Sequence, residues 1–184
     1  MKGKELLLAL TLALTVLPSV KLTSAYTVPE IYMTPYVNPP TPNPYVGFKW
    51  NITIWVKDYG TAPVLAWQAR IRFNGVASGI KVTRGWIGNR YNDPLYIFYG
   101  RATACGMCVI GDPQGSVLCG DSLLGGSGET PPPDPAVLGT IEFMIVKAPG
   151  EFETLTTPLT FDGVDTYFLD ESLNSITPIL TGGV

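Results

Sequence analysis

The sequence predicts an all-β domain, and three observations lead to this class. Val, Ile, Thr, Tyr, Phe and Trp recur in short runs that Gly and Pro interrupt. Several runs alternate apolar and polar residues, which is the pattern of a strand with one buried face. After the N-terminal segment, no stretch keeps helical periodicity for more than about two turns. Short strands at this spacing indicate a sandwich or a barrel.

The N-terminal segment has the layout of a secretory signal peptide. Two Lys precede an apolar run at 6–17, and small residues stand before Tyr26. The run is shorter than the roughly 20 apolar residues of a membrane-spanning helix. We therefore expect residues 1–25 to be removed. Residues 26–184 then form one secreted domain, extracellular or at the cell surface, without a membrane span.

The charge of the chain argues against a nucleic-acid partner. Its formal net charge is −3, and three Lys but only one Glu leave with residues 1–25. The mature chain is therefore more acidic than the whole. Binding to nucleic acid depends on clustered Lys and Arg, so this class of partner is excluded.

The two clearest strands are predicted at 48–57 and 65–73, joined by the turn DYGTAP. In the first, the inward positions are Phe48, Trp50, Ile52, Ile54 and Val56, and the outward positions are Lys49, Asn51, Thr53, Trp55 and Lys57. In the second, the inward positions are Leu65, Trp67, Ala69, Ile71 and Phe73, and the outward positions are Ala66, Gln68, Arg70 and Arg72. Each strand therefore has one face in the core and one in water.

The remaining elements are less regular. The Pro-rich run at 34–47 is expected to hold an extended first strand and its connection, or a flexible arm. Residues 125–136 form a polar loop rich in Pro and Gly. Further strands are predicted at 95–104, 116–123, 137–147, 157–161, 167–169 and 176–180.

The three Cys residues favour a disulfide over a metal site. Zinc needs four ligands, and the chain has three Cys and no His. Residues 112–115 predict a tight turn between two strands. If the two ends of this turn face each other, Cys108 lies opposite Cys119. A one-residue bulge would let Cys105 pair instead, and one Cys is left over in either case.

The letters of a serine esterase motif occur at Gly120–Leu123, but the chain lacks the base that this chemistry requires. A Ser hydroxyl is a poor nucleophile without an adjacent base, and there is no His. Ser122 is therefore not expected to be catalytic. We predict a non-enzymatic protein with no cofactor and no metal. The acidic residues near the C-terminus are expected to form turns; they are Asp162, Asp165, Asp170 and Glu171.

The order of these strands resembles that of a cohesin domain, the β-sandwich module with which scaffold proteins of cellulose-degrading complexes hold enzymes that carry dockerins. The segments that carry the resemblance are IYMTP, VGFKWNITIWVKD, LAWQARIRFN, SVLCGDSLLGGSG, VLGTIEFMIVKAPGEFETLTTPLTF and TYFLDESLNSITP. They cover nearly all of residues 26–184. The resemblance implies a nine-stranded jelly-roll β-sandwich of cohesin type, with CGDSLLGG on the sixth strand and its exit loop.

The resemblance also implies a partner and a face that binds it. Cohesins bind dockerins through a flat sheet face to which the third strand contributes, and here that strand presents Gln68, Arg70 and Arg72. The family's Asn and Asp contacts fall at Ala66 and Gln68, and its Asp-Pro is replaced by Asn74-Gly75. We expect a dockerin-like protein or a polysaccharide on Gln68, Arg70 and Arg72, because Arg binds carboxylates and stacks on sugar rings.

Two further features concern the surface. Asn51-Ile52-Thr53 is a glycosylation sequon on the outward face of its strand, so a glycan at Asn51 would leave the opposite sheet free for a partner. Trp55, on the polar side of its strand, and Trp86, in a predicted loop, are candidates for a carbohydrate platform.

A structural role is the alternative function. In this hypothesis the arm at 26–47 inserts as a strand into a neighbouring subunit and builds a cell-surface filament.

Overall fold

A computed structural model describes residues 27–36, 45–60, 64–111, 115–125, 133–151 and 155–183. The predicted signal peptide, 1–25, lies outside the described residues. None of the helices in the described ranges is long and apolar enough to cross a membrane.

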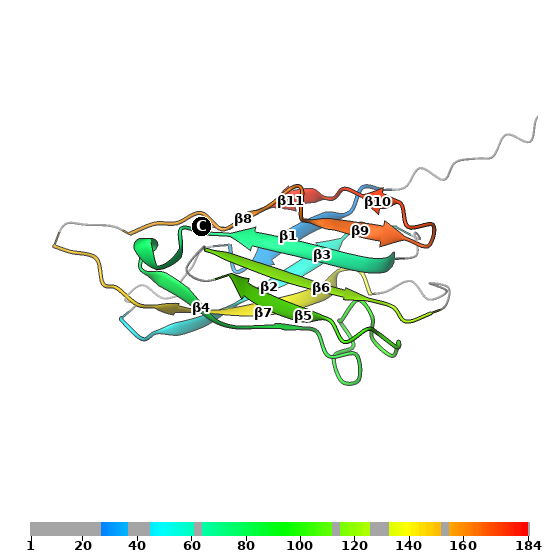
Figure 1. Ribbon diagram of the computed structural model, residues 1–184, viewed down its shortest axis with the longest axis horizontal. Helices are drawn as coiled ribbons and strands as arrows, with labels where there is room; N and C mark the ends of the chain where they lie inside the picture. Colours follow the sequence, from blue (N-terminus) through cyan, green and yellow to red (C-terminus); the bar gives the residue numbers. More distant parts are fainter. Residues whose placement is uncertain are drawn as a thin grey trace, which may run out of the picture.

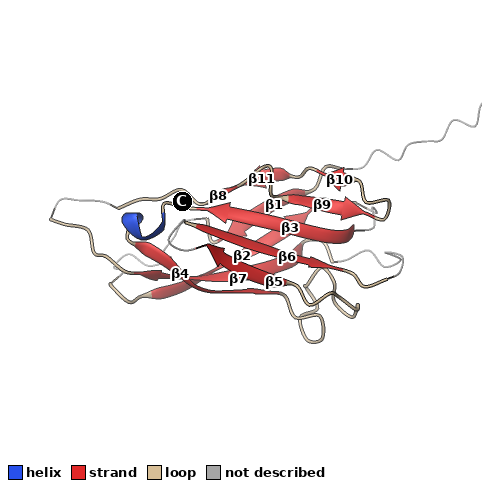
Figure 2. Ribbon diagram, in the orientation of Figure 1, coloured by secondary structure: helices blue, strands red, loops and turns tan. Residues whose placement is uncertain are grey.

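The described residues form two β-sheets packed face to face, as the sequence predicted (Figures 1 and 2). The strands are β1 (Glu30–Thr34), β2 (Lys49–Lys57), β3 (Val64–Arg72), β4 (Ile80–Ile87), β5 (Met107–Gly111), β6 (Ser116–Ser122), β7 (Ala136–Ile145), β8 (Thr160–Phe161), β9 (Tyr167–Asp170), β10 (Ser175–Ile176) and β11 (Ile179–Thr181). One sheet has the order β11-β1-β2-β7-β4. The other has the order β10-β9-β3-β6-β5, and β8 also pairs with β3.

The described residues contain eleven strands, where the resemblance implied nine. Three of the eleven, β8, β10 and β11, have only two or three residues. β8 and β9 both pair with β3, and residues 162–166 interrupt them. They therefore share one position in the sheet, and the interruption raises the number of strands without adding a layer.

The core lies between the inward faces of the two sheets. Trp67, Ile71 and Phe168 come from one sheet, and Ile52 and Phe143 from the other, and all are buried. The alternation predicted for the second and third strands is therefore confirmed at these positions. Removing such side chains from water is the main favourable term in folding, at about 25 cal/mol per Å² of apolar surface.

Two sequence predictions about strands are wrong. Residues 95–104 form turns with isolated bridges instead of a strand, and Tyr96, Ile97 and Phe98 are all buried. Three consecutive buried residues are incompatible with a strand that has one wet face. The strand β4 was not predicted, and Trp86, which was expected in a loop, lies on it. A bulge between Val82 and Arg84 breaks the alternation of β4.

The first strand begins earlier than the Pro-rich run suggested. β1 occupies residues 30–34 and pairs with β2 and with β11 of the same chain. Ile31 and Met33 are fully buried in the core. The part of the arm that forms a strand therefore completes the sheet of its own chain.

The predicted disulfide between Cys108 and Cys119 is confirmed, and Cys105 is a free, exposed thiol. The two bonded residues are directly opposite each other on β5 and β6. Gly85 of β4 faces them, since a Cβ at this position would lie 2.8 Å from the Cβ of Cys108. The absence of a side chain at Gly85 lets the edges of the two sheets approach at the disulfide.

Candidate partner-binding face

The outward side chains of β9, β3, β6 and β5 form one surface, which we call the binding face. The strand register places Gln68 between Tyr167 of β9 and Gly120 of β6, with Met107 of β5 beyond. In the next row Leu118 of β6 lies opposite both Arg70 and Val109. In the view of Figure 1 these strands lie in front of the other sheet.

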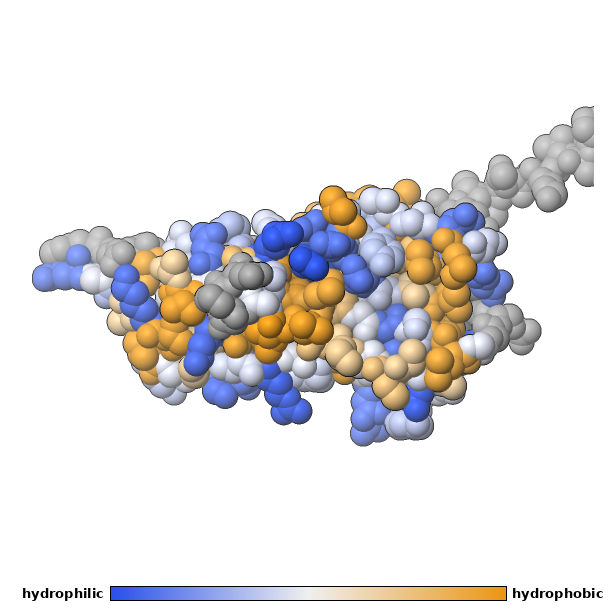
Figure 3. All heavy atoms as spheres, viewed as in Figure 1, coloured by the Kyte–Doolittle hydropathy of each residue, from blue (hydrophilic) through white to orange (hydrophobic). Residues whose placement is uncertain are grey.

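The middle of the binding face is a shallow apolar hollow of about 350 Å³. The side chains of Met107 and Val109 are 64% and 54% exposed there. Gly120 forms part of the floor, because it has no side chain to fill the space between its neighbours. Figure 3 shows hydrophobic side chains gathered in the middle of this face, beside a hydrophilic cluster. Exposed apolar patches rimmed by polar residues mark interaction sites.

The polar border of the hollow is built from residues of β3 and the segment 162–166. The guanidinium of Arg72 forms an ion pair with Asp162, and its Nε donates a 2.6 Å hydrogen bond to Oδ2 of Asp162. Arg70 Nε lies 3.1 Å from Oδ2 of Asp165. Gln68 Nε2 donates to the carbonyl oxygen of Asp165 at 3.2 Å. The hydrogen bonds from Arg72 and from the backbone N–H of Val164 hold the pKa of Asp162 below its ordinary value.

The structure therefore brings Gln68, Arg70 and Arg72 together on one face, as expected, but each contacts the chain's own 162–166 segment. Sequence reasoning missed the apolar residues beside them, which are Met107, Val109 and Leu118. The sequence could have indicated these residues in part, because the Cys108–Cys119 pairing fixes which residues of β5 and β6 point outward. No signal in the sequence indicated the two Arg–Asp pairs, whose members are about ninety residues apart.

The esterase-like letters serve the architecture of this face. Asp121 points inward and is 6% exposed, whereas Ser122 lies opposite Ala66 on the outward side. Asp121 Oδ1 accepts hydrogen bonds from the backbone N–H of Gly106 at 2.9 Å and of Ser122 at 2.8 Å. The carboxylate thus fastens the segment before β5 to β6 and fixes one end of the hollow.

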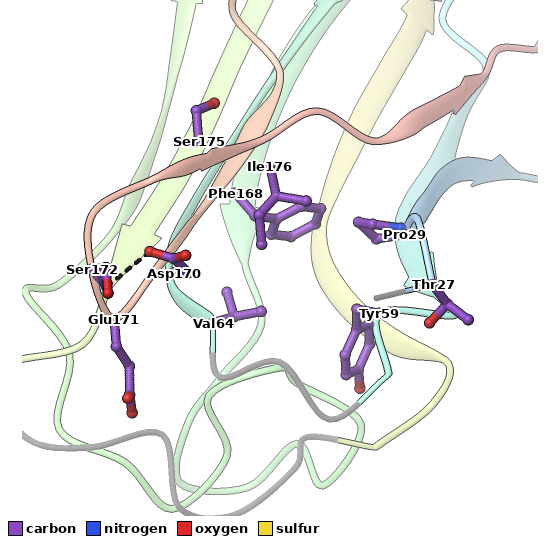
Figure 4. A pocket seen from close by; sticks show the side chains of 10 residues that line it. All are labelled: Thr27, Pro29, Tyr59, Val64, Phe168, Asp170, Glu171, Ser172, Ser175 and Ile176. Carbon is purple, nitrogen blue, oxygen red and sulfur yellow. Dashed lines mark hydrogen bonds between the residues drawn. The ribbon is translucent and has the colours of Figure 1, made fainter. Parts of the chain in front are cut away.

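A second hollow of about 350 Å³ lies at one end of the sandwich. Tyr59 and Phe168 stand on opposite sides of it (Figure 4). Asp170 at its rim accepts hydrogen bonds from the backbone N–H groups of Ser172 and Asn174, both at 2.8 Å. This carboxylate therefore closes a turn, which agrees with the turn role expected for it. Nowhere in the described ranges do three His, Cys, Asp or Glu side chains group closely enough to hold a metal ion.

Asn51 is exposed on the outer face of the sheet that contains β2. The structure thus places the sequon and the binding face on opposite sides of the sandwich. Whether a glycan is attached there remains a prediction of the sequence.

Fold and site together define a two-sheet β-sandwich with a flat, partly apolar sheet face. No protein-family model matches the sequence, and no curated protein matches it. Several solved structures, in contrast, are similar to this chain in fold. A type I cohesin–dockerin complex from Clostridium thermocellum aligns with a TM-score of 0.60 at 13% identity, over 85% of this chain and 91% of that chain.

Two further solved structures extend this similarity. The sixth cohesin of scaffoldin B from Acetivibrio cellulolyticus, in complex with a dockerin, aligns with a TM-score of 0.57 at 14% identity, over 85% of this chain and 96% of that chain. A non-cellulosomal cohesin from the archaeon Archaeoglobus fulgidus aligns with a TM-score of 0.54 at 11% identity, over 85% and 88%. The chain has the cohesin fold.

Proposed function

We propose that this protein is a secreted, non-catalytic module of cohesin type that holds a dockerin-like protein on its binding face. The observation that carries the proposal is the apolar hollow among Met107, Val109 and Leu118, on a sheet of a cohesin fold. Two of the structures with this fold are described as complexes with dockerins. The Cys108–Cys119 disulfide supports secretion, since disulfides persist in oxidising compartments.

The chemistry of the face favours a protein over a polysaccharide. The apolar side chains that line the hollow are mainly aliphatic or thioether, and Tyr167 of β9 is an aromatic residue among its lining. Protein interfaces combine an apolar centre with a polar rim of this kind. Sugars stack on exposed aromatic planes, and among the described outward residues that line the hollow the aromatic ring is that of half-buried Tyr167.

The polar border would give the partner its orientation. Arg72 is exposed and Arg70 is half-buried, so acidic groups of a partner could compete with Asp162 and Asp165 for them. Charged groups at the rim of an interface act on association rate and specificity more than on affinity. In this proposal the hollow supplies most of the binding free energy, and Gln68, Arg70 and Arg72 set the register of the partner.

The alternative of a filament subunit built by strand exchange receives less support. It requires the N-terminal arm to act as a donor strand, but β1 already fills a position in its own sheet, with Ile31 and Met33 in the core. Exchange would require this strand to leave, at the cost of two buried apolar side chains.

The proposal is tested by capture on the immobilised chain 26–184. The probes are a panel of purified type I and type II dockerin modules, and proteins from the culture fluid of the source, identified by mass spectrometry and then purified. We expect a dockerin-like protein to bind in purified form. If no purified protein binds and the chain elutes as a defined polymer, the filament alternative is supported and this function is wrong.

A further inference from the structure

Three aromatic rings that the binding face does not use lie together on the outer face of the other sheet. Tyr32 on β1 lies directly opposite Trp55 on β2. The ring centroids of Tyr32 and Trp55 are 6.5 Å apart, with planes 13° from parallel. Those of Tyr32 and Tyr36 are also 6.5 Å apart, with planes 21° from parallel. We call these three near-parallel rings the aromatic row.

The aromatic row lies on the solvent side of its sheet, where Tyr32 and Trp55 are half-buried. The neighbours of Tyr32 and Trp55 along their strands are fully buried, so these two rings project from the opposite side of the sheet. Tyr36 is 50% exposed. A centroid separation of 6.5 Å is longer than the contact distance of two overlapping ring faces, about 3.5–4 Å. The ring faces are therefore not in close contact with each other. Lys57 Nζ lies 5.6 Å from the centroid of Tyr32 and covers part of that ring.

A row of hydroxyl groups runs beside the rings. The strand register places the hydroxyl-bearing residues Thr34, Thr53 and Thr140 in one line across β1, β2 and β7, and the ring of Trp86 on β4 continues this line. The indole N–H of Trp55 donates a 2.8 Å hydrogen bond to Oγ1 of Thr34, which fixes the orientation of its ring. Flat apolar surface and hydrogen-bonding hydroxyls thus lie next to each other on this face.

Two ion pairs join oppositely charged side chains of this face. Glu30 lies 3.0 Å from Lys57, and Lys49 lies 2.9 Å from Glu142. Such pairs leave no strong field of either sign around the rings. An uncharged ligand suits this surface better than an anionic or a cationic polymer.

We propose that the aromatic row binds an uncharged polysaccharide. A pyranose ring has an apolar face of C–H groups and a rim of hydroxyls. Its apolar face matches the rings of Tyr36, Tyr32 and Trp55, and its rim matches the hydroxyls of Thr53 and Thr140. This site lies on the opposite sheet from the binding face, so it leaves that face free for a protein. The chain would then connect a protein partner to a polysaccharide surface.

The test measures retention of the chain 26–184 on insoluble cellulose and chitin, and its mobility in gels that contain soluble xylan or mixed-linkage glucan. Polygalacturonate serves as the charged counterpart. Asn51 lies on the same face, four residues along β2 from Trp55, so all proteins carry Asn51→Gln to exclude a glycan. The test variant is Tyr36→Ala with Trp55→Ala. The control is Tyr91→Ala, which removes a ring that is 75% exposed outside the aromatic row.

We expect at least one uncharged polymer to bind, the double variant to bind about tenfold or more weakly, and Tyr91→Ala to bind as the parent does. Thermal unfolding establishes that each variant is folded. If the double variant does not fold, Tyr36→Ala alone must weaken binding and Trp55→Phe, which keeps a ring, must largely retain it. The inference is overturned if none of the four uncharged polymers binds, if loss of the rings leaves binding unchanged, or if polygalacturonate is preferred.

Discussion

The hydroxyl of Tyr96 donates a 2.6 Å hydrogen bond to Oδ2 of the buried carboxylate of Asp121. Burial, followed by the hydrogen bond to Asp121, raises the pKa of Tyr96 well above its ordinary value, so the hydroxyl remains a donor. The other carboxylate oxygen accepts from the backbone of Gly106 and Ser122. One carboxylate therefore joins a buried turn, the segment before β5 and the strand β6.

Replacing Asp121 is expected to destabilise the domain strongly. Asp121→Ala leaves up to three buried or half-buried donors without their acceptor, and each such loss costs about 1–3 kcal/mol. We expect a decrease of roughly 2–4 kcal/mol in the free energy of unfolding for Asp121→Ala, and about 1–2 kcal/mol for Tyr96→Phe. Urea denaturation followed by fluorescence measures both. A change below about 0.5 kcal/mol in Asp121→Ala would show that water replaces these bonds at little cost.

Loss of the disulfide is also expected to destabilise the chain. The bond joins residues separated by 11 positions, and for a loop of this length the chain-entropy relation gives about 3 kcal/mol. The variant Cys108→Ala with Cys119→Ala should unfold at a correspondingly lower urea concentration. Cys105→Ser, which changes an exposed thiol, should have almost no effect.

Thiol titration of the native chain checks the same assignment independently. We expect one reactive thiol per chain, and a peptide map should place it at Cys105. A map that finds Cys105 in a disulfide would mean that the register of β5 and β6 differs from the one described.

The Arg72–Asp162 pair predicts a dependence of stability on acid. The hydrogen bond from Arg72, followed by that from Val164, lowers the pKa of Asp162 below its ordinary value of 3.8. A carboxylate with a lowered pKa contributes stability that is present above the unfolded-state pKa and is lost as pH falls through the folded-state pKa. Asp162→Asn should therefore be less stable than the parent at pH 7, and the difference should shrink as pH falls below about 4.

Thermal unfolding at pH 7 and at pH 2.5 measures this difference. Glu30 and Glu142 also have lowered pKa values, through Lys57 and through Thr83 respectively, so the parent itself loses stability in acid. The informative quantity is the difference in unfolding temperature between the parent and Asp162→Asn at each pH. A gap that is equal at both pH values would mean that Asp162 acts by packing and not by charge.

Much of the fold could be predicted because long alternating runs fix both the strands and their inward faces. β2 and β3 were found in this way, and a turn of four residues was enough to align Cys108 with Cys119. The elements that were missed break the alternation. In β4, Gly85 packs against the disulfide and has no side chain to contribute to the alternation. The bulge before Arg84 also shifts the alternation of apolar and polar residues by one position.

The candidate site was predicted only in part. The outward residues of β3 follow from alternation, so Gln68, Arg70 and Arg72 could be placed on one face. Their partners Asp162 and Asp165 are distant in sequence, and only the pairing of β8 and β9 with β3 brings them near. The apolar hollow forms because β5 lies beside β6. The predicted turn at 112–115 indicated this pair of strands, but no local pattern predicted that its outward side chains would be apolar.

The most direct test of the account is the affinity of the purified partner for the chain in which Leu118 is replaced by Asp. Leu118 lies between Arg70 and Val109 at the centre of the binding face, and covering a carboxylate with a partner in this apolar hollow removes it from water, which costs several kcal/mol. Calorimetry should show a loss of about a hundredfold or more, with unchanged thermal unfolding. Ile179→Asp, at a site that is 55% exposed on the other sheet, should bind as the parent does. Equal affinities of the parent and Leu118→Asp would contradict the assignment of this face.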